Sequence, residues 1–159
     1  MSGAVLGNYI GLKDLIKNEE GEIVGAILFD YIDNKEFKVN SKVIVNCTGT
    51  WSDELRLMDD PKAKKRIIGS RGVHLIMPEK YTPENVGLLV PKTKDGRVMF
   101  FLPFKGQTLA GTTDHVHQID STPPSAPPED VKEITNELSN YFNGDVEKDV
   151  KSAWCGIRP

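Results

Sequence analysis

The sequence predicts a mixed α+β fold in two parts. A strand pair followed by an uninterrupted apolar run predicts that residues 1–52 form the edge of a doubly wound nucleotide-binding domain. Three short apolar runs separated by glycine turns predict an antiparallel sheet within residues 53–159. One amphipathic segment in the same part predicts a single helix beside that sheet.

The first part is expected to contain a hairpin and a buried strand. Residues 22–30 and 35–40 are rich in strand-forming side chains and flank the turn pair 33–34. Residues 42–47 are apolar without alternation, which is typical of a strand covered on both faces. This run ends in the small turn 48–50. A glycine-containing turn after a buried strand is where open α/β sheets bind ligands.

The second part is expected to contain a meander of short strands. Apolar runs at residues 86–91, 97–102 and 108–111 are separated by the turn pairs 95–96 and 105–106, each of which ends in glycine. Short runs joined by such turns are typical of neighbouring antiparallel strands.

A further strand and one helix complete the second part. Residues 72–77 predict the strand. Pro128 suits the first position of the helix, and the two acidic residues that follow it suit the positive end of the helix dipole. The pair 143–144, Asn-Gly, is expected to end the helix. The apolar side chains on one face of this helix are Val131, Ile134, Leu138 and Tyr141.

The composition argues against several classes of function. The 20 basic and 23 acidic side chains give a net charge of −3, and the basic run at 62–66 is too short for a nucleic-acid interface, so we interpret it as a solvated loop. No apolar run approaches the ~20 residues of a membrane span. Cys47 and Cys155 are expected to be free thiols, because neither belongs to a Cys-x-x-Cys pair. His115 and His117 could be metal ligands, but with no third ligand nearby we favour an exposed loop.

Six short motifs follow one another along the chain. They are Asn46–Asp53, Arg56–Asp60, Gly72–Leu75, Val98–Pro103, Ala110–Asp114 and Ala153–Pro159. Each motif is weak alone, but as an ordered set they resemble the FAD-dependent glycerol-3-phosphate dehydrogenase family, and its mitochondrial type most closely. The chain departs from that family at Cys47 and Cys155, which replace small residues, and at Thr50, which replaces a proline.

The resemblance implies an enzyme that oxidises sn-glycerol 3-phosphate to dihydroxyacetone phosphate by hydride transfer to FAD. The electrons would pass to a quinone at the mitochondrial inner membrane. Residues 1–52 would then be a partial FAD-binding domain, and residues 53–159 a substrate-binding domain that ends at the flavin-side Gly-Ile-Arg-Pro segment. Another two-domain flavoenzyme acting on amines or hydroxyacids, or a non-catalytic anion-binding module, is the alternative.

The sequence contains no Gly-x-Gly-x-x-Gly phosphate loop ahead of these motifs. We therefore interpret the chain as an internal fragment, and we expect it to lack FAD and activity when isolated. No targeting segment is recognisable in it, so membrane association is expected only through the longer parent protein. Surface normally covered by the missing part would be exposed, which favours self-association of the fragment.

Two residues are the main catalytic candidates. Oxidising a secondary alcohol requires a group that accepts the hydroxyl proton near neutral pH, and His74 is of the right type. A histidine packed beside a strand is the structural alternative, and the resemblance favours the catalytic role. Arg158 is the first candidate for binding the substrate phosphate, because a guanidinium offers forked donors. The resemblance places this arginine between flavin and substrate.

Other residues have weaker assignments. A phosphate-binding role for Arg71 is as well supported as no role, and Arg66 and Arg97 are expected at the surface. The phenylalanines of the meander are expected to be core or wall. The residues that the resemblance assigns to cofactor binding are Thr48, Gly49, Trp51, Thr112, Gly156 and Pro159.

Overall fold

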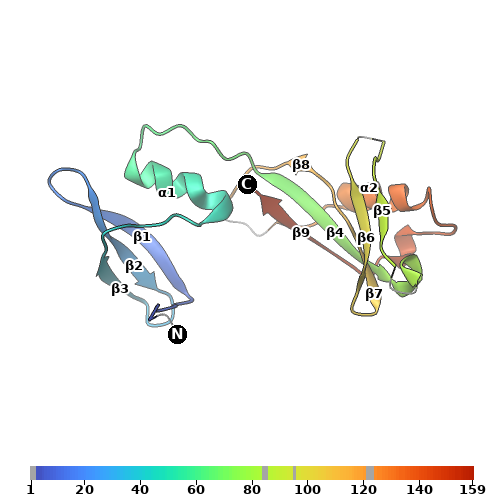
Figure 1. Ribbon diagram of the computed structural model, residues 1–159, viewed down its shortest axis with the longest axis horizontal. Helices are drawn as coiled ribbons and strands as arrows, with labels where there is room; N and C mark the ends of the chain where they lie inside the picture. Colours follow the sequence, from blue (N-terminus) through green and yellow to red (C-terminus); the bar gives the residue numbers. More distant parts are fainter. Residues whose placement is uncertain (1–2, 84–85, 95, 121–123) are drawn as a thin grey trace. The chain divides into compact units, whose positions relative to one another are not determined.

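The computed structural model describes residues 3–83, 86–94, 96–120 and 124–159, and the predicted α+β class is confirmed (Figure 1). The chain divides into two compact units, Met1–Arg66 and Ile67–Pro159. The predicted division after residue 52 falls inside the first unit, because a helix that begins there packs against the first strand. The assignment of the parts to FAD and substrate binding stays a prediction.

The first unit consists of an antiparallel three-stranded sheet and one helix. The sheet has the order β1 (Ile10–Lys17), β2 (Ile23–Asp30) and β3 (Lys35–Asn40). The short 3-10 helix η1 (Gly49–Trp51) leads directly into α1 (Ser52–Asp59). The predicted hairpin is confirmed as β2 and β3, whereas β1 and α1 were not predicted.

The predicted buried strand at residues 42–47 is wrong. No strand ladder includes this segment among the described residues, and Val43 and Val45 are 75% and 76% exposed. Ile44, between them, is partly buried. A strand exists only where a neighbour supplies hydrogen-bond partners, and the described chain places none beside this segment. The apolar run is therefore present in sequence but stays largely uncovered.

The second unit is a six-stranded antiparallel sheet. Strands β5, β6, β7 and β4 follow one another, β8 pairs with the start of β4 on the same edge as β7, and β9 pairs along the opposite edge of β4. The bounds are β4 (Ser70–Pro78), β5 (Leu88–Val90), β6 (Met99–Phe104), β7 (Gln107–Gly111), β8 (His115–Val116) and β9 (Ser152–Arg158). The predicted strand at 72–77 thus becomes the central strand β4, and the meander is confirmed as β5, β6 and β7. Strands β8 and β9 were not predicted.

The described residues of the meander turns lie where the sequence predicted them. Lys105 and Gly106 join β6 to β7 with positive φ angles of 51° and 70°. Gly96, in the preceding turn, has a φ of 88°, which glycine adopts without a side-chain clash. Its predicted turn partner Asp95 lies outside the described residues.

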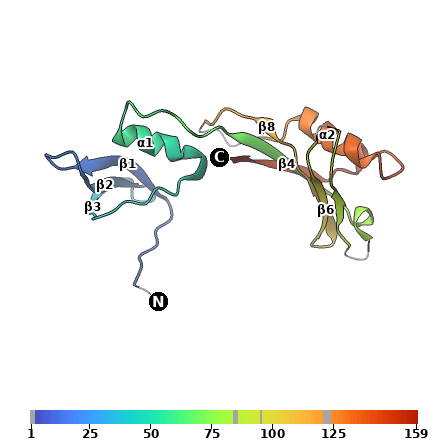
Figure 2. The same cartoon turned by 45° about the horizontal axis from the view of Figure 1, so that its top comes forward.

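Helix α2 (Pro128–Leu138) covers one face of this sheet and closes the core (Figures 1 and 2). Pro128 begins it as predicted, and Ile134 and Leu138 are fully buried. Tyr141 lies beyond the helix end and is 50% exposed. Burying each large apolar side chain stabilises by about 1.5–3 kcal/mol. The sheet side chains of this core, all at most 1% exposed, are Val73, Leu75, Met77, Val90, Met99, Phe101 and Ala110.

The second unit also contains two short 3-10 helices, η2 (Glu79–Tyr81) and η4 (Glu147–Asp149). The Tyr81 hydroxyl donates to Asp149 Oδ2 at 2.7 Å. Neither α-helix of the described chain has the length and apolarity needed to cross a membrane.

Candidate functional site

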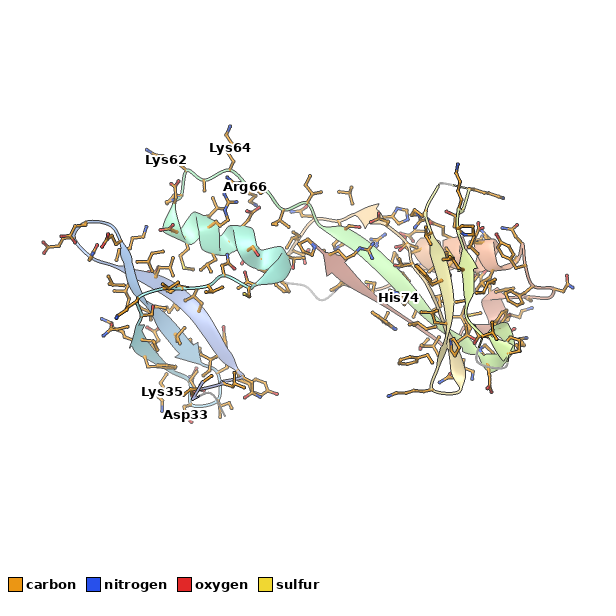
Figure 3. The ribbon with its side chains drawn as sticks, in the orientation of Figure 1. Asp33, Lys35, Lys62, Lys64, Arg66 and His74 are labelled. Atoms are coloured by element: carbon orange, nitrogen blue, oxygen red, sulfur yellow. The ribbon has the colours of Figure 1, made fainter. Side chains whose placement is uncertain are left out.

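The face of the second sheet opposite α2 carries His74 in a row of cross-strand neighbours. Strand pairing aligns Trp154, His74, Gly111, Phe100 and Leu89 across β9, β4, β7, β6 and β5. Directly opposed residues of antiparallel strands lie on the same face. The alternation along β4 buries Val73 and Leu75 against the core and turns His74 to the other side. Figure 3 shows His74 on this strand.

The His74 imidazole has different neighbours on its two sides. It stacks on the Trp154 indole, with 4.6 Å between ring centroids and 14° between ring planes. On the β7 side, a Cβ added at Gly111 would lie 2.8 Å from His74 Cδ2, so only glycine leaves room for the ring there. His74 Nδ1 is buried and has no hydrogen-bond partner among the described residues.

Burial lowers the pKa of His74 below its ordinary value, and the positive charge of Arg158 lowers it further. Both effects disfavour the imidazolium form. The ring is therefore neutral near pH 7 and can accept a proton. Because Nδ1 is buried, Nε2 is the nitrogen that a substrate would reach.

Two glycines separate the His74 row from Arg158. Gly72 and Gly156 are directly paired on β4 and β9, and the next pair on the same face is Ser70 with Arg158. His74 and Arg158 thus share one face, about 13 Å apart along the strand direction at ~3.3 Å per residue. A Cβ at Gly72 would clash with Arg158 Nη1 and would lie 2.7 Å from Thr112 Oγ1. The guanidinium therefore extends over Gly72 towards His74.

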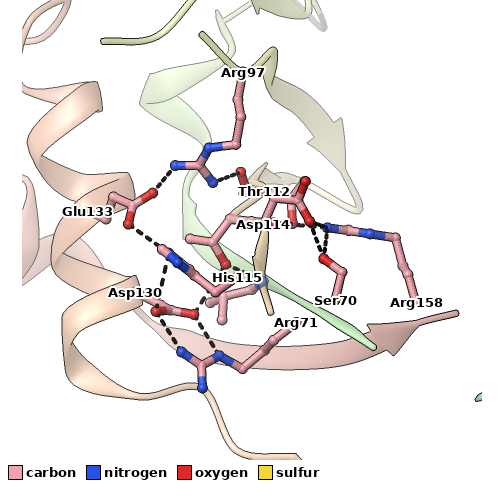
Figure 4. A network of polar contacts seen from close by, with 11 residues as sticks. Ser70, Arg71, Arg97, Thr112, Asp114, His115, Asp130, Glu133 and Arg158 are labelled. Atoms are coloured by element: carbon pink, nitrogen blue, oxygen red, sulfur yellow. Dashed lines mark hydrogen bonds and ion pairs between the residues drawn. The ribbon is translucent and has the colours of Figure 1, made fainter. Parts of the chain in front are cut away.

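Three acceptors hold the Arg158 guanidinium in this position (Figure 4). Its Nη2 donates to Thr113 O and Asp114 Oδ1, each at 3.1 Å, and to Ser70 Oγ at 3.4 Å. The Ser70 hydroxyl also donates to Asp114. Bonds from Ser70 and Arg158 lower the pKa of Asp114, so its carboxylate stays charged opposite the guanidinium.

Arg71 lies on the opposite face of β4 and does not join this site. Its Nε and Nη2 donate to Asp130 Oδ2 and Oδ1 at 2.9 and 3.0 Å, and the Asp130 side chain is 2% exposed. The bond to Asp130 raises the pKa of Arg71. Thr113 Oγ1 donates to the same carboxylate at 3.2 Å. The suggested phosphate role is not supported, because strand alternation turns this arginine towards α2.

Arg97 was predicted at the surface but is partly buried. Its side chain is 18% exposed, forms an ion pair with Glu133 of α2, and donates from Nη1 to Thr112 O at 3.2 Å. His115 Nε2 lies 2.9 Å from Glu133 Oε2. These three side chains line a cavity of about 460 Å³ between the sheet and α2. The described residues contain no group of three or more potential metal ligands. The exposed loop expected at His115 and His117 is wrong, because both residues are partly buried and His115 lies in β8.

The basic loop at 62–66 is exposed except at Ala63, and the predicted surface position of Arg66 is confirmed. Figure 3 shows Lys62, Lys64 and Arg66 along this loop. The Arg66 backbone N–H donates to Asp53 Oδ2 at 2.6 Å, which fixes the loop to α1.

In the first unit, the predicted cofactor residues Thr48, Gly49 and Trp51 form one tight turn. Thr48 Oγ1 donates to Asn46 Oδ1 at 2.7 Å, and Asn46 Nδ2 donates to Ser52 O at 3.0 Å. Gly49 has a φ of 58°, which favours glycine. Trp51 is 48% exposed. Thr48 and Trp51 both line a cavity of about 540 Å³ within this unit, beside β1 and α1.

In the second unit, the other predicted cofactor residues lie around the glycine pair. Thr112 Oγ1 is close to Gly72, and a Cβ added at Gly156 would meet no atom within 4 Å. Pro159 follows β9 and is exposed. The sequence interpretation missed Trp154, Ser70 and the bonding role of Asp114. Recognising residues 152–158 as a strand would have placed Trp154, two residues before Gly156, on the face of Arg158.

Comparison with known proteins gives consistent matches. The family model "FAD dependent oxidoreductase" matches residues 3–159. The mitochondrial glycerol-3-phosphate dehydrogenase of Schizosaccharomyces pombe is 39% identical, over 99% of this chain and 26% of its own length. The corresponding protein of Mus musculus is 43% identical, over 99% of this chain and 23% of its own length. The chain thus spans about a quarter of the length of these relatives.

Solved structures share the fold. The glycerol-3-phosphate dehydrogenase from Bacillus halodurans, complexed with FAD, superimposes with a TM-score of 0.85 at 30% identity, over 98% of this chain and 32% of that one. L-proline dehydrogenase from P. horikoshii superimposes with a TM-score of 0.71 at 17% identity, over 98% of this chain and 39% of that one, and this likeness concerns the fold alone.

Proposed function

Because this chain belongs to the FAD-dependent oxidoreductase family, we propose that the protein containing it oxidises sn-glycerol 3-phosphate to dihydroxyacetone phosphate. The observation that carries the proposal is the pairing of His74 and Arg158 on one face of the second sheet, with only Gly72 and Gly156 between their rows. The names of the similar proteins support the choice of substrate.

The residues of the second unit fit a flavin. A planar ring can approach backbone closely only where side chains are absent, and the open space above Gly156 provides such a surface. Thr112 and Pro159 flank this surface in the proposed site. When bound, FAD supplies the acceptor for the hydride that leaves C2 of the substrate. In the first unit, the turn of Thr48, Gly49 and Trp51 is the proposed cofactor contact.

His74 and Arg158 have separate tasks in the proposed reaction. Nε2 of the neutral His74 ring takes the proton of the C2 hydroxyl, which its lowered pKa allows near pH 7. The Arg158 guanidinium binds the substrate phosphate through forked donors. Asp114, Ser70 and the Thr113 carbonyl fix its Nη2 end before substrate arrives. A pre-positioned donor loses less conformational freedom on binding.

We further propose that electrons leave the reduced cofactor for a quinone and that the protein acts at the mitochondrial inner membrane. The names of the relatives, which include the word mitochondrial, support the organelle but do not specify the membrane. Self-association of the 159-residue chain is also proposed, because Val43 and Val45 expose an apolar segment without a pairing partner among the described residues.

The test is turnover of glycerol 3-phosphate by the longer protein that contains this chain, followed with a soluble quinone analogue. His74→Asn is expected to lower kcat about 100-fold or more, because it removes the proton acceptor. Arg158→Lys is expected mainly to raise KM, because a point charge replaces a fork. Partly buried His117→Asn, outside the proposed site, and exposed Arg66→Lys serve as controls. Turnover of glycine or 2-hydroxy acids in place of glycerol 3-phosphate, or full activity of His74→Asn, would contradict the proposal.

A further inference from the structure

Among the described residues, none forms a hydrogen bond with the inner nitrogen of the His74 ring. An acid-base histidine is commonly held by a bond from one ring nitrogen to a carboxylate or a carbonyl. Here His74 Nδ1 is buried, and no described residue bonds to it. The direction of Nε2 is therefore not set by a hydrogen bond between Nδ1 and a described residue.

Packing on both sides of the ring replaces that bond. Trp154, the direct cross-strand neighbour of His74, stacks nearly parallel to it at 4.6 Å. On the other edge of β4, the backbone of Gly111 closes the space beside Cδ2. Rotation of the ring about its χ angles would press it against the indole or against the β7 backbone.

We propose that Trp154 is the positioning residue of His74, which sets the direction of Nε2 and shields the ring from water. The proposal rests on the proposed function, in which His74 accepts the substrate proton. Trp154 itself is 50% exposed, so its indole does not belong to the buried core. The lowered pKa of His74, whose first cause is burial, agrees with a shielding role.

The first test is proton NMR titration of the three histidines in the 159-residue chain. Trp154→Leu is expected to remove the ring-current shift from the His74 carbon-bound protons and to raise the pKa of His74 towards its ordinary value of about 6.5. Trp154→Phe keeps a stacked ring and should retain both effects in part. His115 and His117 report in the same spectra that the fold is intact.

Phe104→Leu is the matched control, since Phe104 is a 44% exposed aromatic of the same sheet whose ring lies beside Lys105 Nζ. It should leave the His74 signals unchanged. The proposal is overturned if Trp154→Leu leaves the shifts and the pKa of His74 as they were. If Trp154→Leu does not fold, Trp154→Phe decides, because unchanged His74 shifts in that variant also reject stacking.

The second test is steady-state kinetics of the longer protein. Trp154→Leu is expected to lower kcat about tenfold or more with little change in KM, and to move the acid limb of the pH profile upward with the pKa of His74. Trp154→Phe should recover most of the activity. A protein that never turns over glycerol 3-phosphate would refute the proposed function, whereas the NMR result would still decide whether Trp154 positions His74.

Discussion

Removing the Asp130 carboxylate should destabilise the second unit strongly. Asp130 is 1% exposed at the start of α2 and accepts two bonds from Arg71 and one from Thr113. Through these bonds it ties the helix to β4 and to the segment after β7. Asp130→Ala deletes all three at once and leaves the Arg71 guanidinium, whose side chain is 18% exposed, without its charge partner.

The expected magnitude follows from the burial of the pair. Removing one member of a buried ion pair costs about 3–5 kcal/mol, because the other charge stays desolvated. Arg71 retains some solvent contact, so we expect about 3 kcal/mol. Replacing both partners by apolar residues, Arg71→Met with Asp130→Leu, should restore most of this loss, since no unpaired charge remains.

The assay is urea unfolding of the chain followed by tryptophan fluorescence. A Trp51→Phe background leaves Trp154 as the reporter, and it lies in the second unit. Asp145→Ala, which breaks an exposed pair with Lys148, is the control and should not move the midpoint. A loss below about 1 kcal/mol for Asp130→Ala, or a double variant no more stable than it, would refute the reasoning.

Three further predictions concern the site. If the longer protein has the proposed activity, Gly72→Ala places a methyl group against Arg158 and should lower its kcat/KM for glycerol 3-phosphate about 100-fold. Gly156→Ala meets no atom within 4 Å and should leave folding stability unchanged. Asp114→Asn removes the charge that faces Arg158 and should raise KM about two- to fivefold, and an unchanged KM would argue against that contact. The pKa of His74 is lowered in the folded chain, so its stability contribution is complete above a pH of about 6.5 and is lost as the pH falls through the lowered pKa. The unfolding free energy of the His74→Asn variant should therefore fall less between about pH 7.5 and pH 5 than that of the unchanged chain. An equal fall in both would argue against the pKa shift.

Local pattern was sufficient for the elements whose signals are short in range. The hairpin of β2 and β3, the meander and α2 all follow from alternation, turn glycines and the helix start at Pro128. The segment 42–47 has an equally clear pattern, yet it does not form a strand among the described residues. Its prediction assumed neighbours on both sides, and a sequence pattern cannot supply a pairing partner.

The site residues show the same limit. His74 and Arg158 were selected as residue types suited to proton transfer and phosphate binding, and the structure brings them to one face. Arg71 has the same chemistry as Arg158 and lies closer to His74 in sequence, but it faces the helix and bonds to Asp130. Trp154 had no assigned role, because its contact with His74 depends on the pairing of strands far apart in the chain.

The amino-acid sequence by itself therefore determined the α+β class, the family and the chemical types present at the site. Tertiary structure alone decided which arginine faces His74, which residue stacks on its ring, and which carboxylates are committed to holding cations. The physical reason is that side-chain type and local period are encoded in neighbouring residues, whereas strand register joins residues as distant as 74 and 154. A shift of one residue in that register would turn Trp154 and Arg158 to the opposite face.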